Sequence, residues 1–352
     1  MKSDADIIVV GGGPAGSAAA IHARQSGLTV IVIEADGQPR RRPGETLHSG
    51  AASILEQLGV REAFEHAIGG RYGSIQVEWS TARSSDRGSI PLAAASGFHI
   101  FRDKLDAVLI ERAETLSADV RRPCRALRPI VRDQEVVGVE TDSGPLEAPF
   151  VIDASGNGNW FRKSYPSRVD VLSPRLLARY GYCRVDDLRD FGSPSIKGDQ
   201  SGWQWIARVS DDTLAWVSLA LPGASARPVK PTALAALADV SPTRGADVTW
   251  KRADAYSGPG FFLVGDAAFQ LDPAAGHGIL RAMMSGIMAT YQAAAAIKGR
   301  VGPDEAAQLY RGWMAEWWRR DTSALTEMYL RLDATWDRSS STREHHQSEA
   351  GA

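Results

Sequence analysis

The sequence predicts an α/β protein in which a parallel sheet, assembled from separated segments, is interrupted by a mainly antiparallel sheet and followed by C-terminal helices. Three observations support this prediction. A strand, a glycine cluster, a helix and a second strand follow one another within residues 6–34. Alternating, aromatic-rich segments occupy much of residues 165–250. The chain then returns to an apolar strand, Phe261–Val264.

The first strand–helix–strand unit is the best-defined part of the pattern. Asp6–Val10 is short and largely apolar, which is typical of a parallel strand buried on both faces. Pro14–Gln25 is rich in alanine, and its proline fits the first helical turn, where no backbone donor is needed. Thr29–Glu34 is a β-branched second strand.

The later elements follow from the same kinds of signal. Glycine and proline mark a loop near residues 40–44, and residues 80–97 are polar and predict another loop. The remaining predicted strands are Gly73–Trp79, Val131–Thr141, Phe150–Ala154, Trp203–Val209 and Thr213–Leu219. The predicted helices are Ser49–Leu58, Arg102–Ser117, Gly278–Ile297 and Asp304–Arg331.

These elements predict a discontinuous nucleotide-binding domain over residues 1–70, 98–164 and 253–300. A substrate domain over residues 71–97 and 165–252 is inserted into it. Residues 301–338 supply the C-terminal helices, and the small, polar residues 339–352 predict a disordered tail.

Composition narrows the classes of partner. The 40 basic and 42 acidic residues nearly cancel, leaving a formal net charge of -2. This balance offers no basic excess for nucleic acid or an anionic membrane surface. Cys124 and Cys183 lie far apart without metal-type spacing, so we expect neither a disulfide nor a metal site. No apolar run approaches the roughly 20 residues that span a bilayer, and no secretory leader is evident, so we expect a cytoplasmic protein.

A dinucleotide-binding motif lies between the first strand and the first helix. Its glycines are Gly11, Gly13 and Gly16, which let the backbone approach a pyrophosphate at the helix N-terminus. Glu34 ends the second strand, where a carboxylate accepts hydrogen bonds from ribose hydroxyls. An acidic residue there repels a 2'-phosphate, so the site favours FAD or NAD over NADP.

The choice of FAD rests on a resemblance. The segment FFLVGDAAFQLDPAAGHG, Phe261–Gly278, resembles the glycine–aspartate motif of the glutathione-reductase-type flavoproteins, which include aromatic hydroxylases and flavin-dependent halogenases. This likeness implies that Asp266 holds the ribityl chain and that Pro273–Gly278 lies along the flavin ring. The helix that starts near Gly278 would then point backbone donors at the pyrimidine end of the flavin, where negative charge gathers on reduction.

Two further segments are similar to this family: VIDASG, Val151–Gly156, and the arginine of FRDKLDAVL, Arg102. Alone, Arg102 is also compatible with an ordinary surface helix. The family implies an FAD-binding fold of the glutathione-reductase type. The residues expected at the cofactor are Gly11, Gly13, Pro14, Ala15, Gly16, Glu34, Ala35, Arg42, Glu45, Thr46, Arg102, Asp153, Gly265, Asp266, Pro273, Gly276, Gly278 and Ile279.

A narrower resemblance concerns three segments: RPGETLHSG, Arg42–Gly50, then LDPAAGHGILRAMMSG, and the Trp317–Trp318 pair. They look like the LodB/GoxB-type flavoproteins that mature tryptophylquinone enzymes. This likeness implies a monooxygenase that transfers oxygen from a flavin hydroperoxide to a tryptophan side chain of a precursor protein during cofactor biogenesis. Its electrons would come from NAD(P)H or a separate flavin reductase.

The candidate catalytic residues lie in two of these segments. Glu45, Thr46 and His48 follow a glycine and could reach the reactive face of the flavin, although Glu45 and Thr46 could instead cap the next helix. His277 could orient a peroxide or an indole, or make a purely structural hydrogen bond.

Trp203 and Trp205 are the predicted substrate residues, although the sequence alone favours a sheet-core role for these tryptophans. Their segment, Gly202–Ile206, also resembles the tryptophan-rich motif of the halogenases, with Ala207 in place of the expected proline.

Halogenation is the main competing hypothesis. The halogenases use a lysine on a strand after the first strand–helix–strand unit. Here that strand reads Arg71–Ile75, and no lysine occurs between Lys2 and Lys104. We therefore rank halogenation, or hydroxylation of a small molecule, below hydroxylation of a partner protein. A third hypothesis is an FAD-bearing assembly factor that binds the precursor without oxidising it.

Overall fold

A computed structural model describes residues 3–79, 96–165, 167–186, 191–224, 228–333, 336 and 343–344. Its central sheet is parallel except at one edge, where β19 (Ser257–Gly258) pairs antiparallel with its neighbour. The strand order is β19 (Ser257–Gly258), β20 (Phe261–Leu263), β11 (Phe150–Asp153), β1 (Ile7–Val10), β2 (Val30–Ile33) and β7 (Asp119–Arg121). The α/β Rossmann-like fold is therefore confirmed, with the chain reversing its direction of growth between β1 and β11.

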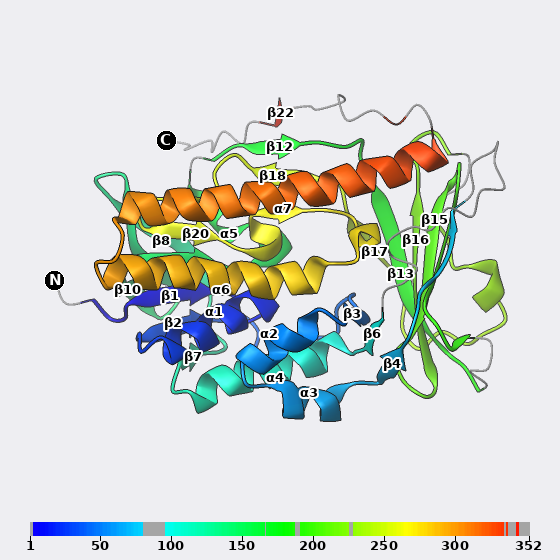
Figure 1. Cartoon of the computed structure of the whole chain (residues 1–352), viewed down its shortest axis with the longest axis horizontal. Helices are drawn as coiled ribbons and strands as arrows, with labels where there is room; N and C mark the ends of the chain where they lie inside the picture. The colour runs from blue at the N-terminus through cyan, green and yellow to red at the C-terminus, as the bar shows by residue number, and fades with distance from the viewer. Residues whose placement is uncertain are drawn as a thin grey trace.

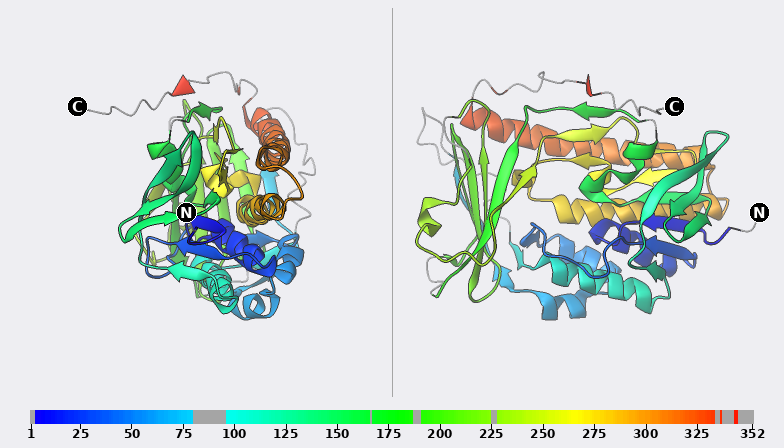
Figure 2. Two further views of the ribbon diagram at one scale, coloured as in Figure 1. Left: turned by 90° about the vertical axis from the view of Figure 1, so that its left-hand side faces the viewer. Right: turned by 180° about the vertical axis from the view of Figure 1, so that it is seen from behind.

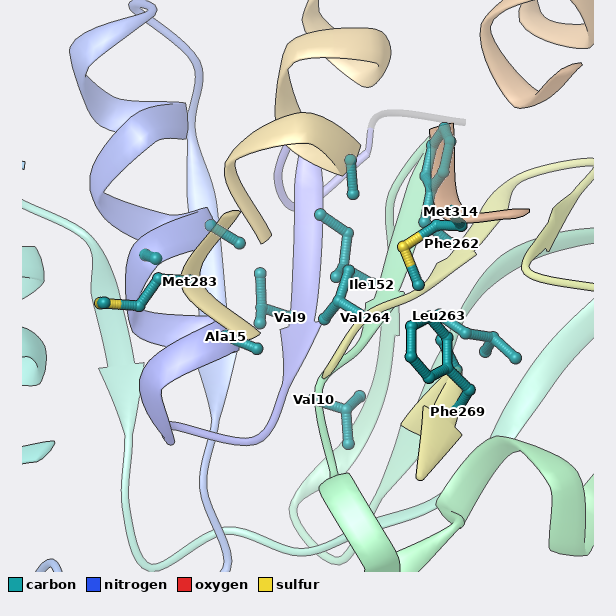
Figure 3. Close-up of a cluster of buried hydrophobic side chains, with 14 of the residues drawn as sticks. Val9, Val10, Ala15, Ile152, Phe262, Leu263, Val264, Phe269, Met283 and Met314 are labelled. Atoms are coloured by element: carbon teal, nitrogen blue, oxygen red, sulfur yellow. The ribbon is translucent and has the colours of Figure 1, made fainter. Parts of the chain in front are cut away.

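The central sheet is buried on both faces, which explains its unbroken apolar strands. All residues of β1, β2 and β11 are buried. Figure 3 shows Val9, Ile152 and Val264 in one cluster with Met283. Helices α1 (Pro14–Gln25) and α6 (Gly278–Ile297) pack against each other beside the sheet.

The close packing of α1 against α6 depends on a glycine. A Cβ atom at Gly286 would lie 2.1 Å from the carbonyl oxygen of Ala15. The two backbones therefore approach more closely than any side chain at position 286 allows. This contact fixes the first turn of α1 relative to α6, and both helices border the candidate site.

A second sheet stands at the end of the molecule away from the N-terminus (Figures 1 and 2). Its strands pair antiparallel, except that β5 runs parallel to β14. The order is β17 (Arg244–Asp247), β13 (Leu177–Arg184), β16 (Thr213–Ala220), β15 (Gly202–Arg208), β14 (Ser195–Asp199) and β5 (Gln76–Trp79). This is the mainly antiparallel sheet that the sequence predicts.

Helix α7 (Pro303–Leu332) joins the two sheets. It runs beside α6 along the molecule, and its C-terminal end reaches the second sheet (Figure 1). There the indole nitrogen of Trp79 donates to the carbonyl of Met328 at 2.7 Å, and that of Trp203 donates to the hydroxyl of Tyr329 at 2.9 Å. The helix is thus bonded to the sheet from which the candidate substrate residues come.

The structure differs from the predicted elements between the first and second sheets. A short strand, β3 (Thr46–His48), precedes α2 (Ala51–Gln57) and pairs with β6 (Gly97–His99). The strand predicted over residues 73–79 starts later, as β5. A separate strand, β4 (Gly70–Tyr72), precedes it and pairs with a different sheet. Residues 80–95 of the predicted loop lie outside the described residues.

The remaining elements are short, apart from α4 (Arg102–Thr115), which packs on α1 and buries one of its faces. They are α3 (Arg61–Ala67), α5 (Trp160–Ser164), β8 (Ala126–Arg132), β9 (Glu135–Thr141), β10 (Gly144–Glu147), β12 (Val169–Val171), β18 (Lys251–Ala253), β21 (Phe269–Gln270) and β22 (Arg343–Glu344). Within the predicted disordered tail, Arg343–Glu344 pairs with β12, and the other tail residues lie outside the described part. None of the described helices combines the length and the apolar character needed to cross a membrane.

Candidate active site

A cavity of about 1130 Å³ extends from the carboxyl ends of β1, β2 and β11 to the face of the second sheet. Such positions, where neighbouring parallel strands are followed by connections in opposite directions, are the usual ligand sites of open α/β sheets. The cavity has a cofactor half, lined by loops of the central sheet, and a chamber lined by the second sheet.

The glycine loop forms one end of the cofactor half. Gly11 has a positive φ of 106°, and a Cβ there would lie 2.5 Å from the carbonyl oxygen of Ala154. A Cβ at Gly16 would lie 1.9 Å from the carbonyl oxygen of Gly11, so this glycine serves the turn and does not itself line the cavity. A Cβ at Gly13 meets nothing within 4 Å, although the residue lines the cavity. The space before Gly13 therefore fits a pyrophosphate approaching the N-terminus of α1.

Glu34 is held rigidly at the end of β2. One carboxylate oxygen accepts from the backbone nitrogen of Gly12 at 2.6 Å, and the other accepts from that of Asp36 at 2.8 Å. Glu34 and Ala35 both line the cavity. A carboxylate in this position suits ribose hydroxyls and disfavours a phosphate, as the sequence predicts.

The opposite wall comes from the segment before α6. Asp266, Pro273, Gly276, Gly278 and Ile279 line the cavity, as does Gly265. Helix α6 begins at Gly278, so the unpaired backbone donors of its first turn face this wall. The glycine loop, the fixed Glu34 and this helix terminus together fit FAD, with its nucleotide and flavin at opposite ends.

Arg102 connects the cofactor half to α4. Its guanidinium donates to both carboxylate oxygens of Asp106, at 3.1 and 3.0 Å, and to the carbonyl of Pro43 at 3.2 Å. Arg102 lines the cavity, and so does the more exposed Arg42. The predicted surface-helix alternative for Arg102 is wrong, because the side chain ties the loop before β3 to the cavity wall.

The chamber is largely apolar. Trp203 and Trp205 of β15 both line it. Trp203 is only 2% exposed and is hydrogen-bonded, so it is part of the core and of the chamber wall at once. Trp205 is half-buried. The other lining residues from this sheet and its neighbouring segments are Ala178, Tyr180, Ile196, Val217, Ala246 and Val248.

Comparisons with known proteins agree with this geometry. The family described as "FAD dependent oxidoreductase" matches residues 6–164. A tryptophan 2-halogenase from Chondromyces crocatus is 26% identical over 88% of this chain and 65% of its own length. A 1H-pyrrole-2-carbonyl-[peptidyl-carrier protein] brominase from Pseudoalteromonas luteoviolacea is 26% identical over 84% of this chain and 78% of its own length.

The chain is an FAD-dependent oxidoreductase. The solved flavin-dependent brominase Bmp2 has the same fold, with a TM-score of 0.77 and 23% identity over 88% of the oxidoreductase and 83% of the brominase. Together, the family match and the sequence similarity to the two halogenases support a place for the oxidoreductase in the superfamily that contains the halogenases. The narrower resemblance to LodB/GoxB-type maturases stays a prediction.

Besides Gly16, two residues predicted at the cofactor or substrate of the oxidoreductase do not line the cavity. Asp153 is buried, where its carboxylate accepts from the backbone nitrogens of Ser155 at 2.8 Å and Phe161 at 3.2 Å. It therefore shapes the cavity-lining loop that follows β11 rather than facing the cavity. The ring of His277 packs edge-on against that of His48, with centroids 5.7 Å apart. His277 therefore makes a packing contact with a cavity-lining residue and is not itself part of the cavity wall.

The loop predicted to reach the flavin does line the cavity, through Glu45, Thr46 and His48. The helix-capping alternative is wrong, because the N-cap of α2 is Gly50 and no side chain caps it. Glu45 is instead buried, accepting from the hydroxyl of Tyr182 at 2.5 Å and from the backbone nitrogen of Gly44 at 2.9 Å. Burial raises the pKa of the Glu45 carboxyl, against the opposing effect of the Tyr182 hydrogen bond.

We expect Glu45→Gln to flatten the pH dependence of stability. Because the folded pKa of Glu45 lies above its ordinary value of 4.5, the native chain binds more protons than the unfolded chain between these two values. The stabilising contribution is complete below pH 4.5 and is lost as pH rises through the folded pKa. Denaturant titrations of wild type and Glu45→Gln across this range measure the difference, and equal slopes would contradict the assignment.

Sequence analysis did not identify three polar residues that shape this site. Tyr182 reaches Glu45 from β13, across 137 positions of sequence, so no local pattern reveals the pair. Arg281 lines the cavity, and its guanidinium lies 3.4 Å from Asp266 and 3.1 Å from Asp321 of α7. It lies within the quoted LDPAAGHGILR segment, one turn after Gly278, which is the signal that could have identified it. Asp272 of the same segment also lines the cavity.

Proposed function

We propose that this oxidoreductase halogenates an electron-rich aromatic ring held in the tryptophan-lined chamber. The observation that carries the proposal is the continuity of one cavity from the FAD-binding loops to Trp203 and Trp205. The similarity to the two halogenases extends over 84–88% of the chain, well beyond the FAD-binding segments. These comparisons favour the alternative that sequence analysis ranks second.

The chain's own residues would bind the ring and keep water away from it. The chamber wall is mostly apolar, so it favours a flat hydrophobic substrate and disfavours bulk water. Reduced FAD with dioxygen would supply the oxidation by which halide, a ring C–H and protons become a carbon–halogen bond and water. Glu45 stands at the cavity wall with a carboxyl that burial biases towards its protonated form, and it is the candidate proton donor.

Hydroxylation is the second candidate, favoured by a specific feature. Arg71, on the strand where the halogenases carry their lysine, does not line the cavity. Its guanidinium pairs with Glu65 at 2.5 Å and lies 4.7 Å from the ring centre of Phe98. Among the described cavity residues the one lysine is Lys163 of α5, beside the loop after β11. A tryptophan of a partner protein remains the proposed substrate under this second candidate.

The two candidates differ in their dependence on halide. FAD-loaded enzyme would be supplied with NADH, a flavin reductase and dioxygen, and offered indoles, pyrroles, phenols and a tryptophan-containing peptide. Halogenation predicts product only with chloride or bromide, carrying the isotope pattern of the halogen. An oxygen mass gain that is independent of halide would overturn halogenation and support hydroxylation.

Trp205→Ala provides the matched chamber variant for this assay. Trp205 is half-buried and lines the chamber away from the FAD-binding loops, so its truncation should spare FAD binding. We expect kcat/KM for the accepted ring to fall by about 10-fold or more, because an aromatic contact in the bound state is lost. Unchanged kcat/KM would place the substrate elsewhere and count against both candidates.

A further inference from the structure

A buried carboxyl lies on the wall of the cavity that the cofactor half and the chamber share. Asp272 precedes the short helical turn Pro273–Ala275 and lines the cavity, with only 1% of its surface exposed. One carboxylate oxygen accepts from the backbone nitrogen of Ala274 at 2.9 Å, and thereby caps this turn. The other accepts from the indole nitrogen of Trp250 at 2.7 Å. The carboxylate thus connects the segment Pro273–Gly278, which is predicted to lie along the flavin, to Trp250.

Helix α7 extends this contact to the chamber wall. The indole nitrogen of Trp203 donates to the hydroxyl of Tyr329 at 2.9 Å. The Tyr329 ring meets that of Trp250 edge-on, with centroids 5.7 Å apart, and its hydroxyl lies beside the Asp272 carboxylate and lowers the pKa of that group. A hydroxyl has a single proton, and because Tyr329 already accepts from Trp203, that proton is directed to the carboxylate. Trp203 and Asp272 both line the cavity. A continuous buried path therefore runs from Trp203 through Tyr329 to Asp272 and on to Trp250.

We propose that Asp272 is a positioning residue that couples the turn Pro273–Ala275 to the tryptophan wall of the chamber through Tyr329. A change in the charge of the carboxyl would act on both sides of the cavity, because Ala274 and Trp250 donate to it and the hydroxyl that accepts from Trp203 lies beside it. The coupling itself does not depend on the reaction catalysed. Its use in holding an aromatic ring beside the cofactor rests on the proposed function.

The carboxyl is suited to change charge near neutral pH. Burial raises the pKa of Asp272 to about 6, against hydrogen bonds from Trp250, Ala274 and Tyr329. The titratable group that faces it is Tyr329, whose pKa burial raises well above its ordinary value, so that it stays neutral. Above this pH the carboxylate accepts from Trp250 and Ala274 and attracts the proton of the Tyr329 hydroxyl. Below it, the carboxyl carries a proton of its own, and its bonds to the indole and the hydroxyl weaken.

The test follows the indole N–H resonances of ¹⁵N-tryptophan-labelled FAD-loaded protein between pH 5 and 8, with the signals assigned through Trp203→Phe and Trp250→Phe. In wild type we expect both indole protons to move upfield as pH falls, with a shared midpoint near pH 6. In Tyr329→Phe, the Trp250 signal should still titrate and the Trp203 signal should not. In Asp272→Asn, neither should titrate.

The main confounding groups are histidines, which also titrate in this range. His277→Gln is the matched control and should leave both transitions in place. The coupling is overturned if the Trp203 signal does not change with pH in wild type. It is also overturned if that signal still titrates in Tyr329→Phe. Because Tyr329→Phe keeps the carboxylate, it decides the question even where Asp272→Asn fails to fold. The readout needs no turnover, so its failure is distinguishable from failure of the proposed reaction.

Discussion

Gly13→Val should weaken FAD binding by about 100-fold, because a side chain set against a pyrophosphate costs on the order of 3 kcal/mol. The FAD-free chain should tolerate the change. Gly13 has an ordinary φ of -73°, and a Cβ there meets nothing within 4 Å. Titration of FAD into the apoprotein measures the affinity, and thermal melting of the apoprotein measures the stability.

The control for this substitution is Gly312→Ala on α7, where an added Cβ also meets nothing within 4 Å. It should leave FAD affinity unchanged and stabilise the helix by about 0.5–1 kcal/mol. Gly16→Ala is the contrasting case, because its Cβ would lie 1.9 Å from the Gly11 carbonyl oxygen and disturb the fold itself. Undiminished FAD affinity in Gly13→Val would remove the pyrophosphate from this loop.

Sequence reasoning found the cofactor half because its signals are local. Gly11, Gly13 and Gly16 lie within six positions, and Glu34 ends the next strand along the chain. A short connection and a regular βαβ unit bring such residues together in any chain with this pattern. The prediction that Asp153 and His277 face the ligand was less accurate, because resemblance gives the place of a segment and not the direction of each side chain.

The chamber and its supports could not be predicted in the same way. The Glu45–Tyr182 and Trp203–Tyr329 hydrogen bonds span 137 and 126 positions. They exist only once the second sheet and α7 have docked onto the central sheet, and no periodicity encodes that docking. The sequence also could not show whether Trp203 belongs to the core or to the chamber wall, because the residue belongs to both.

The second large effect is expected at Arg281, whose guanidinium is 2% exposed and pairs with the buried carboxylate of Asp321 at 3.1 Å. Arg281→Met should destabilise the chain by about 3–5 kcal/mol, because it leaves a buried charge without its partner. Methionine keeps the apolar stem but not the guanidinium, so the contact of the guanidinium carbon with the Phe269 ring, at 4.4 Å, is lost as well. Denaturant unfolding of the FAD-free protein gives the cost without a contribution from the cofactor.

A double-mutant cycle separates this charge effect from packing. If the cost of Arg281→Met comes from the stranded Asp321 carboxylate, Asp321→Asn in the same chain should recover part of it, although Asp321→Asn alone is also destabilising. The coupling should amount to about 1–3 kcal/mol. Additive costs would instead assign the loss to packing of the Arg281 stem. Since Arg281 also lies 3.4 Å from Asp266, a strong coupling means that α7 helps to hold the aspartate predicted to bind the ribityl chain.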